Sequence, residues 1–307
     1  MNQGDKSEIN RFQLMGIQWK NDKPYFELFD GEKICLETAS GDIYLKRTGH
    51  RYCIGTYELL SHKTIPCPEN NSIFGKNPRC FWCRKKMGFE LCLRCHGEEC
   101  KNANEEALHY CNRPHFVYLA YFPGNVIKVG TAYFQRKTTR LLEQGAVYAL
   151  IIAKCQTGQE ARRLEYTIGQ TGIRTFVRNQ YKLMHPFFEC SSEDIFVLMT
   201  NVYKSLRMLI DPGIKNALYD EPEFLFFPQI RDAIEGMKSF FPRSLFSCAN
   251  YSELEQLDLS RAVEGEIMAI IGANLYLLIQ NSIYAIDMKQ EYGYYLEIER
   301  NRGVVVE

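Results

Sequence analysis

Eight cysteines crowded between residues 53 and 111 constrain the fold of this chain more than any other feature. The sequence around them is polar and poor in Val, Ile and Leu, so this segment lacks the side chains that build a hydrophobic core. Some other kind of link must hold it together. The eight are Cys53, Cys67, Cys80, Cys83, Cys92, Cys95, Cys100 and Cys111.

Zinc binding explains the spacing of these cysteines better than disulfides do. Cys80 and Cys83 form a Cys-x2-Cys pair, as do Cys92 and Cys95, and each pair can bind one side of a tetrahedral ion. The polar N-terminus has no apolar signal core, which disfavours the oxidising compartments where disulfides persist. A redox role is disfavoured because no thioredoxin-like strand precedes the pairs. We predict a zinc-ribbon-like or knuckle-like segment with one or two structural zinc ions.

The pairing of the ligands stays open at this point. Eight thiols would supply two four-cysteine sites, and His62, His96 or His109 could replace a cysteine, although a surface position is the simpler interpretation for each histidine. Because the metal-free segment has little else to stabilise it, metal binding and folding should be one event.

Charge is unevenly distributed along a chain whose formal net charge is zero. Residues 113–182 contain eleven Lys or Arg against three Glu, a balance of +8, whereas residues 251–307 contain four against ten Asp or Glu, a balance of −6. The basic middle favours a phosphate-bearing partner, and the acidic end argues against contact of that end with a nucleic-acid backbone. Two ordinarily charged surfaces would be the simpler alternative.

The basic middle has the pattern of a small α/β core. Apolar runs predict strands at residues 116–122, 125–129 and 146–153. A basic helix ends at Gly145, and a second helix begins after Thr157 with the sequence of a capping box. The first strand is apolar on both faces, so we expect it to be interior.

Two charged residues stand out in this core. Lys128 lies among Val and Ile in the second strand, so it either reaches solvent at the strand end or faces a cleft. Glu165 flanks the buried face of the second helix, where a carboxylate needs a partner. That partner is either Arg162, on the same helix, or a divalent metal ion.

The pattern VYLAYF, VIKVGT, an arginine and a glutamate resembles the GIY-YIG nuclease core. The wider combination of a cysteine-rich segment, PHFVYLA, KVGT, R-x-x-EQGA and A-x-x-x-E is similar to an uncharacterised family of bacterial and archaeal proteins known as a domain of unknown function. The nuclease resemblance implies three roles at a phosphodiester. Tyr118 would orient or deprotonate water, Arg140 would offset charge on the phosphate, and Glu165 would hold Mg²⁺ or Mn²⁺.

Two departures from the nuclease pattern bear on its activity. Lys128 replaces the tyrosine of the second motif half, and Gln144 stands where many relatives have histidine. Lysine can bind phosphate, but the identity of the general base is left open. The rival hypotheses are a non-catalytic adaptor that binds RNA, DNA or a ribosome-like surface, and a zinc-stabilised scaffold for protein interaction.

Basic side chains outside the motif are candidate contacts for DNA or RNA. Arg136 and Lys137 lie on the basic helix of the core, and Arg84 and Lys85 lie between the cysteines. Loops with such side chains often touch phosphates, but ordinary solvated surface explains Arg84 and Lys85 equally well.

These patterns predict an α+β chain in four segments. Residues 1–52 form a small β region, 53–112 the zinc segment, and 113–212 the GIY-YIG-like α/β core with a packing helix. Residues 213–307 form a linker and an acidic β-meander or small barrel, which could bind a protein partner. The uncharged run at residues 267–286 is long enough for a bilayer, but Gly and Asn-Ser turns interrupt it. We therefore expect a soluble, cytoplasmic protein with no membrane contact.

Overall fold

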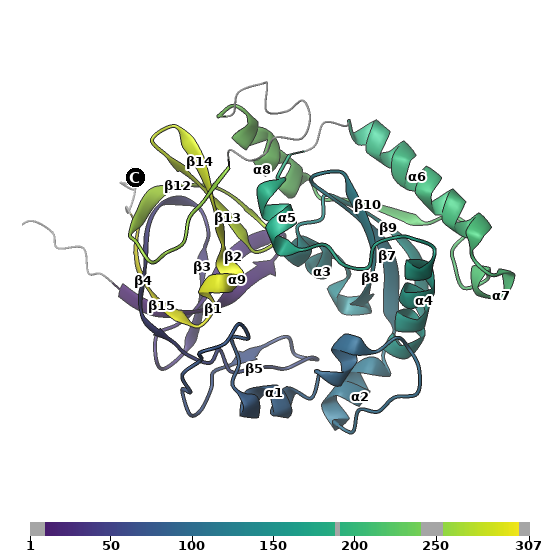
Figure 1. The fold of residues 1–307 in the computed structure, drawn as a ribbon, viewed down its shortest axis with the longest axis horizontal. Coiled ribbons are helices and arrows are strands. Elements are labelled where there is room, and N and C mark those ends of the chain that lie inside the picture. Colours follow the sequence, from purple (N-terminus) through teal and green to yellow (C-terminus); the bar gives the residue numbers. More distant parts are fainter. Residues whose placement is uncertain (1–9, 188–190, 241–253, 301–307) are drawn as a thin grey trace, which may run out of the picture.

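The computed structural model of the chain describes residues 10–187, 191–240 and 254–300. It has the predicted α+β class, and its described strands form a nine-stranded sheet, a four-stranded sheet and a two-stranded ribbon. Figure 1 shows the two larger sheets side by side, with the cysteine-rich segment running beneath both.

The nine-stranded sheet joins strands from both ends of the chain, in the order β11-β14-β13-β12-β4-β15-β1-β2-β3. Its strand β15 pairs with β1 and β4, so the strands predicted at residues 1–52 share one sheet with those predicted after residue 213. The strands are β1 (Asn10–Lys20), β2 (Lys23–Phe29), β3 (Ile34–Thr38), β4 (Gly41–Arg51), β11 (Glu255–Gln256), β12 (Val263–Ile271), β13 (Asn274–Ile279), β14 (Ser282–Asp287) and β15 (Tyr294–Arg300).

The uncharged run at residues 267–286 is a β-meander, as its turn residues predicted. Strands β12, β13 and β14 pair antiparallel in succession. The loop between β13 and β14 is Gln280-Asn281, and both residues have positive φ, which is the conformation that two-residue hairpin loops require. No pairing among the described strands joins β11 to β3, so the sheet is open and the small-barrel alternative is not what forms.

The four-stranded sheet has the order β10-β9-β7-β8. The predicted succession of strand, strand, helix, strand and helix is confirmed, and the first strand is interior, with neighbours on both sides. The elements are β7 (His115–Phe122), β8 (Val126–Tyr133), η2 (Phe134–Arg136), α3 (Lys137–Gln144), β9 (Tyr148–Cys155), α4 (Gly158–Gln170) and β10 (Glu223–Phe226).

Strand β10 lies in a stretch that the sequence suggested was a linker. Its aromatic side chains explain the difference, because they pack on the core. The rings of Phe224 and Phe226 lie 5.6 Å and 4.9 Å from the ring of Tyr148 on the neighbouring strand β9. The division into four segments stays a prediction, but this part of the chain completes the core sheet.

The remaining helices pack around the sheets and are α5 (Asn179–Met184), α6 (Ser192–Leu209), α7 (Pro212–Lys215), α8 (Pro228–Lys238) and α9 (Met288–Glu291). Helix α6 begins with a full capping box formed by Ser191 and Asp194. No helix in the described part of the chain is long and apolar enough to cross a membrane.

The two larger sheets share one continuous hydrophobic cluster. One close contact between them is at Gly145, which ends α3 in the left-handed conformation with φ of 74°. A Cβ atom there would lie 2.8 Å from Ile271 and 3.1 Å from the backbone of Gly272, so glycine allows α3 to meet the β12–β13 turn.

The cysteine-rich segment has little core, as its composition predicted. Its own cluster of buried described residues consists of Leu59, Cys92 and Ala107. The elements are β5 (Thr56–Tyr57), β6 (Thr64–Ile65), α1 (Phe81–Met87), the 3₁₀ turn η1 (Leu91–Arg94) and α2 (Glu105–Cys111).

Candidate metal centre and candidate active site

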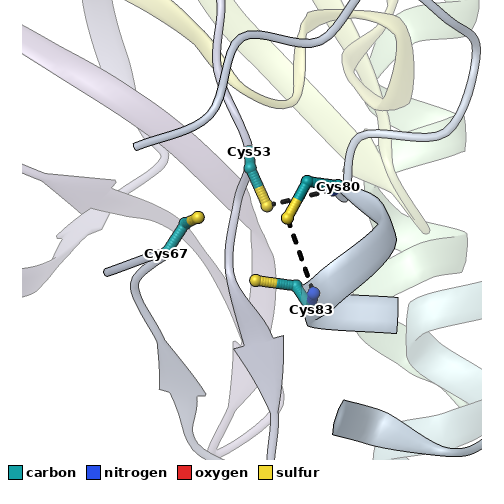
Figure 2. A group of neighbouring side chains, drawn as sticks. All are labelled: Cys53, Cys67, Cys80 and Cys83. Carbon is teal, nitrogen blue, oxygen red and sulfur yellow. Dashed lines mark hydrogen bonds between the residues drawn. The ribbon is translucent and has the colours of Figure 1, made fainter. Parts of the chain in front are cut away.

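Four of the eight cysteines form one cluster, drawn from three separate stretches of chain. Cys53 follows β4, Cys67 follows β6, and Cys80 and Cys83 lie at the start of α1. Figure 2 shows the four side chains pointing toward one another, and their sulfur atoms all lie within 4.8 Å of each other. A tetrahedral zinc site needs sulfur atoms about 3.8 Å apart, so this donor set fits zinc after a small contraction.

Hydrogen-bond donors surround these sulfur atoms, as they do around metal-bound thiolates. The backbone N–H groups of Cys80 and Gly55 donate to Cys53 Sγ over 3.2 Å and 3.3 Å. Cys83 N donates to Cys80 Sγ over 3.5 Å. Burial would raise the pKa of Cys80, but its hydrogen bonds with Cys83 and other neighbours lower it to about 7. A thiol of this kind gives up its proton readily to a metal.

The sequence left open how the two Cys-x2-Cys pairs combine, and in the structure the cluster contains the first pair without the second. Cys80 and Cys83 face the loop after β4, whereas the turn that carries Cys92 and Cys95 packs on α4. Arg162 of α4 donates to the Cys92 carbonyl oxygen, and Arg163 donates to the Gly97 carbonyl oxygen over 2.9 Å. These tertiary contacts hold Cys92 and Cys95 against α4, away from the first pair. The spacing of cysteines in the sequence cannot reveal such contacts.

The other four cysteines lie near one another but are less closely gathered. Burial raises the pKa of Cys111, and the charges of Cys92, Cys95 and Cys100 act in the same direction. Among the residues that the structure describes, the Cys53 cluster is the one group whose ligand atoms lie close enough together to hold a metal after only a small contraction.

The residues of the nuclease-like pattern converge on one face of the four-stranded core. Tyr118 is buried, and it pairs across the sheet with Gly130 of the KVGT motif. A Cβ atom at Gly130 would lie 2.6 Å from the Tyr118 hydroxyl oxygen, so only glycine leaves room for this ring. Gln144 Nε2 donates to the Tyr118 hydroxyl oxygen over 2.7 Å. Gln144 therefore fixes the orientation of the tyrosine hydroxyl group.

Glu165 and Lys128 face the same region from α4 and β8. Thr131 Oγ1 donates to Glu165 Oε2 over 3.4 Å. Burial raises the pKa of Glu165, and the positive charges of Lys128 and Arg162 oppose that rise. Burial and the charge of Arg140 lower the pKa of Lys128 to about 8, while the charge of Glu165 acts against this. Lys128 is thus half-buried on β8, close enough to Glu165 for their charges to interact.

Two lysines that the sequence did not single out complete the site. Burial lowers the pKa of Lys182 on α5 to about 7, and the charges of Lys289, Lys128 and Arg140 add to the effect. Lys182 Nζ also donates to the backbone carbonyl oxygen of Gln144 over 2.7 Å. Lys289 lies on α9, in the acidic part of the chain. No local motif marks either lysine, because only the packing of the two sheets brings them to the core.

Three of the four predicted nucleic-acid contacts are already paired with carboxylates. Arg136 forms an ion pair with Glu143, and Lys137 Nζ lies 2.7 Å from Glu223 Oε1. Arg84 Nη1 lies 2.7 Å from Glu90 Oε1. Lys85 is exposed and lies 6.0 Å from the centre of the exposed Trp82 ring.

The chain belongs to the family described as "Protein of unknown function (DUF2797)", whose model matches residues 41–296. This confirms the resemblance to an uncharacterised family, while the likeness to the GIY-YIG core remains a resemblance. No curated protein and no solved structure matches the chain.

Proposed function

We propose that this protein binds the phosphate backbone of a nucleic acid at the four-stranded core and hydrolyses a phosphodiester bond there. One observation carries the proposal. Arg140, Lys128, Lys182 and Lys289 lie close enough to act electrostatically on one another, and the carboxylate of Glu165 lies beside them. Positive charges that repel one another in this way are stabilised by an anionic ligand, and a phosphate supplies that charge.

The side chains suit separate steps of hydrolysis. Lys128 has a pKa of about 8, so a useful fraction of the molecules carries a neutral Lys128 amine near pH 7.5. That amine can accept a proton from water. The water oxygen then bonds to phosphorus, the bond to the leaving oxygen breaks, and that oxygen takes a proton from solvent. Arg140, whose side chain is 46% exposed, offsets the developing negative charge.

Tyr118 suits an orienting role rather than that of a base. Burial raises its pKa, so the phenol stays neutral at physiological pH. Its hydroxyl oxygen accepts from Gln144, which leaves its own hydrogen to point toward a water or a phosphate oxygen. Glu165 is the carboxylate placed to hold Mg²⁺ or Mn²⁺, and a bound ion would act as a Lewis acid on the phosphate.

Cleavage by wild type and by Glu165→Gln tests this function. We expect wild type with Mn²⁺ to cut DNA or RNA oligonucleotides, and Glu165→Gln to lose at least about 100-fold in rate while binding is kept. Glu160→Gln is the matched control, because Glu160 lies at the start of the same helix and its carboxylate accepts from Gln156 N. Glutamine can replace that bond, so this variant should cleave normally. Wild type that leaves every substrate intact refutes the catalytic claim.

A non-catalytic adaptor is the second candidate, and the position of Lys128 favours it. Its ammonium group attracts Glu165 and so competes with any divalent cation for that carboxylate. The adaptor hypothesis predicts that binding of nucleic acid weakens steeply with salt and that no cleavage occurs. It also predicts unchanged affinity for nucleic acid in Glu165→Gln.

We also propose that the cysteine-rich segment binds two zinc ions, one in the Cys53 cluster and one held by Cys92, Cys95, Cys100 and Cys111. The two sets share a local design. Each contains Cys-x-Gly with the glycine in the left-handed conformation, and the glycine N–H donates to the cysteine Sγ two residues earlier, over 3.3 Å at Gly55 and 3.4 Å at Gly97. Each also has an asparagine amide that donates to sulfur, Asn71 to Cys80 over 3.6 Å and Asn102 to Cys92 over 3.2 Å.

Zinc counting by elemental analysis tests this arrangement. We expect two ions in wild type, one in Cys53→Ser and one in Cys111→Ser. Cys155→Ser is the control, because that thiol is buried on β9 and belongs to neither set. One ion in wild type that disappears in Cys53→Ser would remove the second site.

A further inference from the structure

A cavity of about 480 Å³ lies between the large sheet, the cysteine-rich segment and α3. Its wall mixes aromatic and charged side chains from all three parts, including Trp19, Tyr57, His62, Arg79 and Arg140. Its size is within the range of small-molecule sites, and the few polar groups set among aromatic rings are typical of them.

Two residues in this wall have hydrogen-bonding capacity that the described part of the chain does not meet. Both ring nitrogens of His62 and Nε of Arg79 are buried without a hydrogen-bond partner there. Buried polar atoms are nearly always paired in folded proteins, so unpaired ones beside a cavity point to a ligand. His62 also has φ of 58°, a conformation that costs energy in a residue with a side chain and is concentrated at functional sites.

The cavity adjoins the site of the proposed reaction. Arg140 lines the cavity, and its charge also acts on Lys128 and Tyr118 of the core site. A phosphate beside Arg140 would therefore place its attached sugar and base at the cavity. The half-buried ring of Tyr57 can stack on a base, Trp19 adds an aromatic edge to the wall, and His62 and Arg79 offer groups that can bond to a base edge.

We propose that this cavity binds the base of one unpaired nucleotide next to the phosphate held by Arg140. The inference rests on the proposed function and adds a substrate class, a single-stranded or locally unpaired nucleic acid. A base that stays stacked in a duplex cannot enter a recess between the large sheet and α3, so the nucleotide has to be unpaired or extruded.

Fluorescence of Trp19 gives a direct measurement. The chain contains two tryptophans, and the variant Trp82→Phe leaves Trp19, at the cavity, as the single reporter. We expect adenosine 5′-monophosphate to change its emission saturably, and ribose 5-phosphate, which lacks the base, to change it little. In the same background, His62→Gly tolerates the positive φ and removes the ring, and it should weaken binding of the nucleotide about tenfold.

His50→Ala is the control, since His50 is exposed on β4 and lies outside the cavity wall. Zinc content and circular dichroism establish that His62→Gly is folded.

A single-stranded oligonucleotide should bind more tightly than the same duplex, and His62→Gly should reduce that preference. No saturable response to adenosine 5′-monophosphate, or equal binding of single strand and duplex, overturns the inference. Glu165→Gln separates the two claims, because it should abolish cleavage and leave nucleotide binding unchanged.

Discussion

The four-stranded core and the cysteine-rich segment are neighbours that are stabilised by different physics. Strand β7 is buried along nearly its whole length, and its side chains are part of the large hydrophobic cluster. The segment's own cluster of described buried residues has three members, one of them a cysteine. The core can fold by burying apolar surface, whereas we propose that the segment depends on metal binding by its thiols. Structure in one region should therefore survive a treatment that destroys it in the other.

Removal of metal should separate the two regions by the largest margin. A chelator strong enough to take zinc should unfold residues 53–111, because each structural ion contributes on the order of 10 kcal/mol. Hydrogen exchange resolved by residue would show amides of α1 and α2 losing protection, while amides of β7 and β9 keep theirs. Equal loss of amide protection in both regions would show that the core depends on the segment. It would contradict the view that the two regions are stabilised independently.

A smaller effect, confined to the core, is expected from Gly130→Ala. The new methyl group would overlap the Tyr118 hydroxyl group, which should lower the free energy of unfolding by about 1–3 kcal/mol without changing zinc content. Urea unfolding measures the change. Gly236→Ala on α8 is the matched control, because its Cβ meets nothing within 4 Å and alanine favours a helix. Loss of zinc from Gly130→Ala would contradict the independence of the two regions.

The sequence predicted the elements of the core well and the site only in part. Apolar runs placed the strands and helices of the core, and cysteine spacing predicted a metal site, for which four of the eight cysteines lie close together. Pairing of the cysteines could not be predicted, because hydrogen bonds from Arg162 and Arg163 decide where Cys92 and Cys95 lie. Lys182 was missed for a related reason. It reaches Lys128 through packing between elements far apart in the sequence, and no local pattern records that packing.

A third expected effect is a dependence on pH that belongs to the core site. The folded-state pKa of Lys182 is about 7, below its ordinary value of 10.5, so the unfolded chain binds more protons between these values. The free energy of unfolding should therefore rise as pH increases from about 7 toward 10. Affinity for an oligonucleotide should fall over the lower part of that range, because Lys182 and then Lys128 lose their charge.

Lys182→Gln checks this assignment. Titration calorimetry at several pH values should show that the variant binds more weakly at pH 6.5 and that its affinity changes less between pH 6.5 and 8.5. Lys215→Gln on α7 is a control lysine outside the site, and it should retain the wild-type profile. An unchanged profile in Lys182→Gln would assign the titration to another group.

The central claim is that the carboxylate beside the cation cluster holds a divalent metal, and paramagnetic broadening by Mn²⁺ tests it most directly. In amide spectra of the zinc-loaded protein, substoichiometric Mn²⁺ should broaden the signals of Glu165 on α4 and Thr131 on β8 first. In Glu165→Gln the same addition should leave those signals sharp. Broadening that is centred elsewhere, or that is identical in the variant, would contradict a metal site at Glu165.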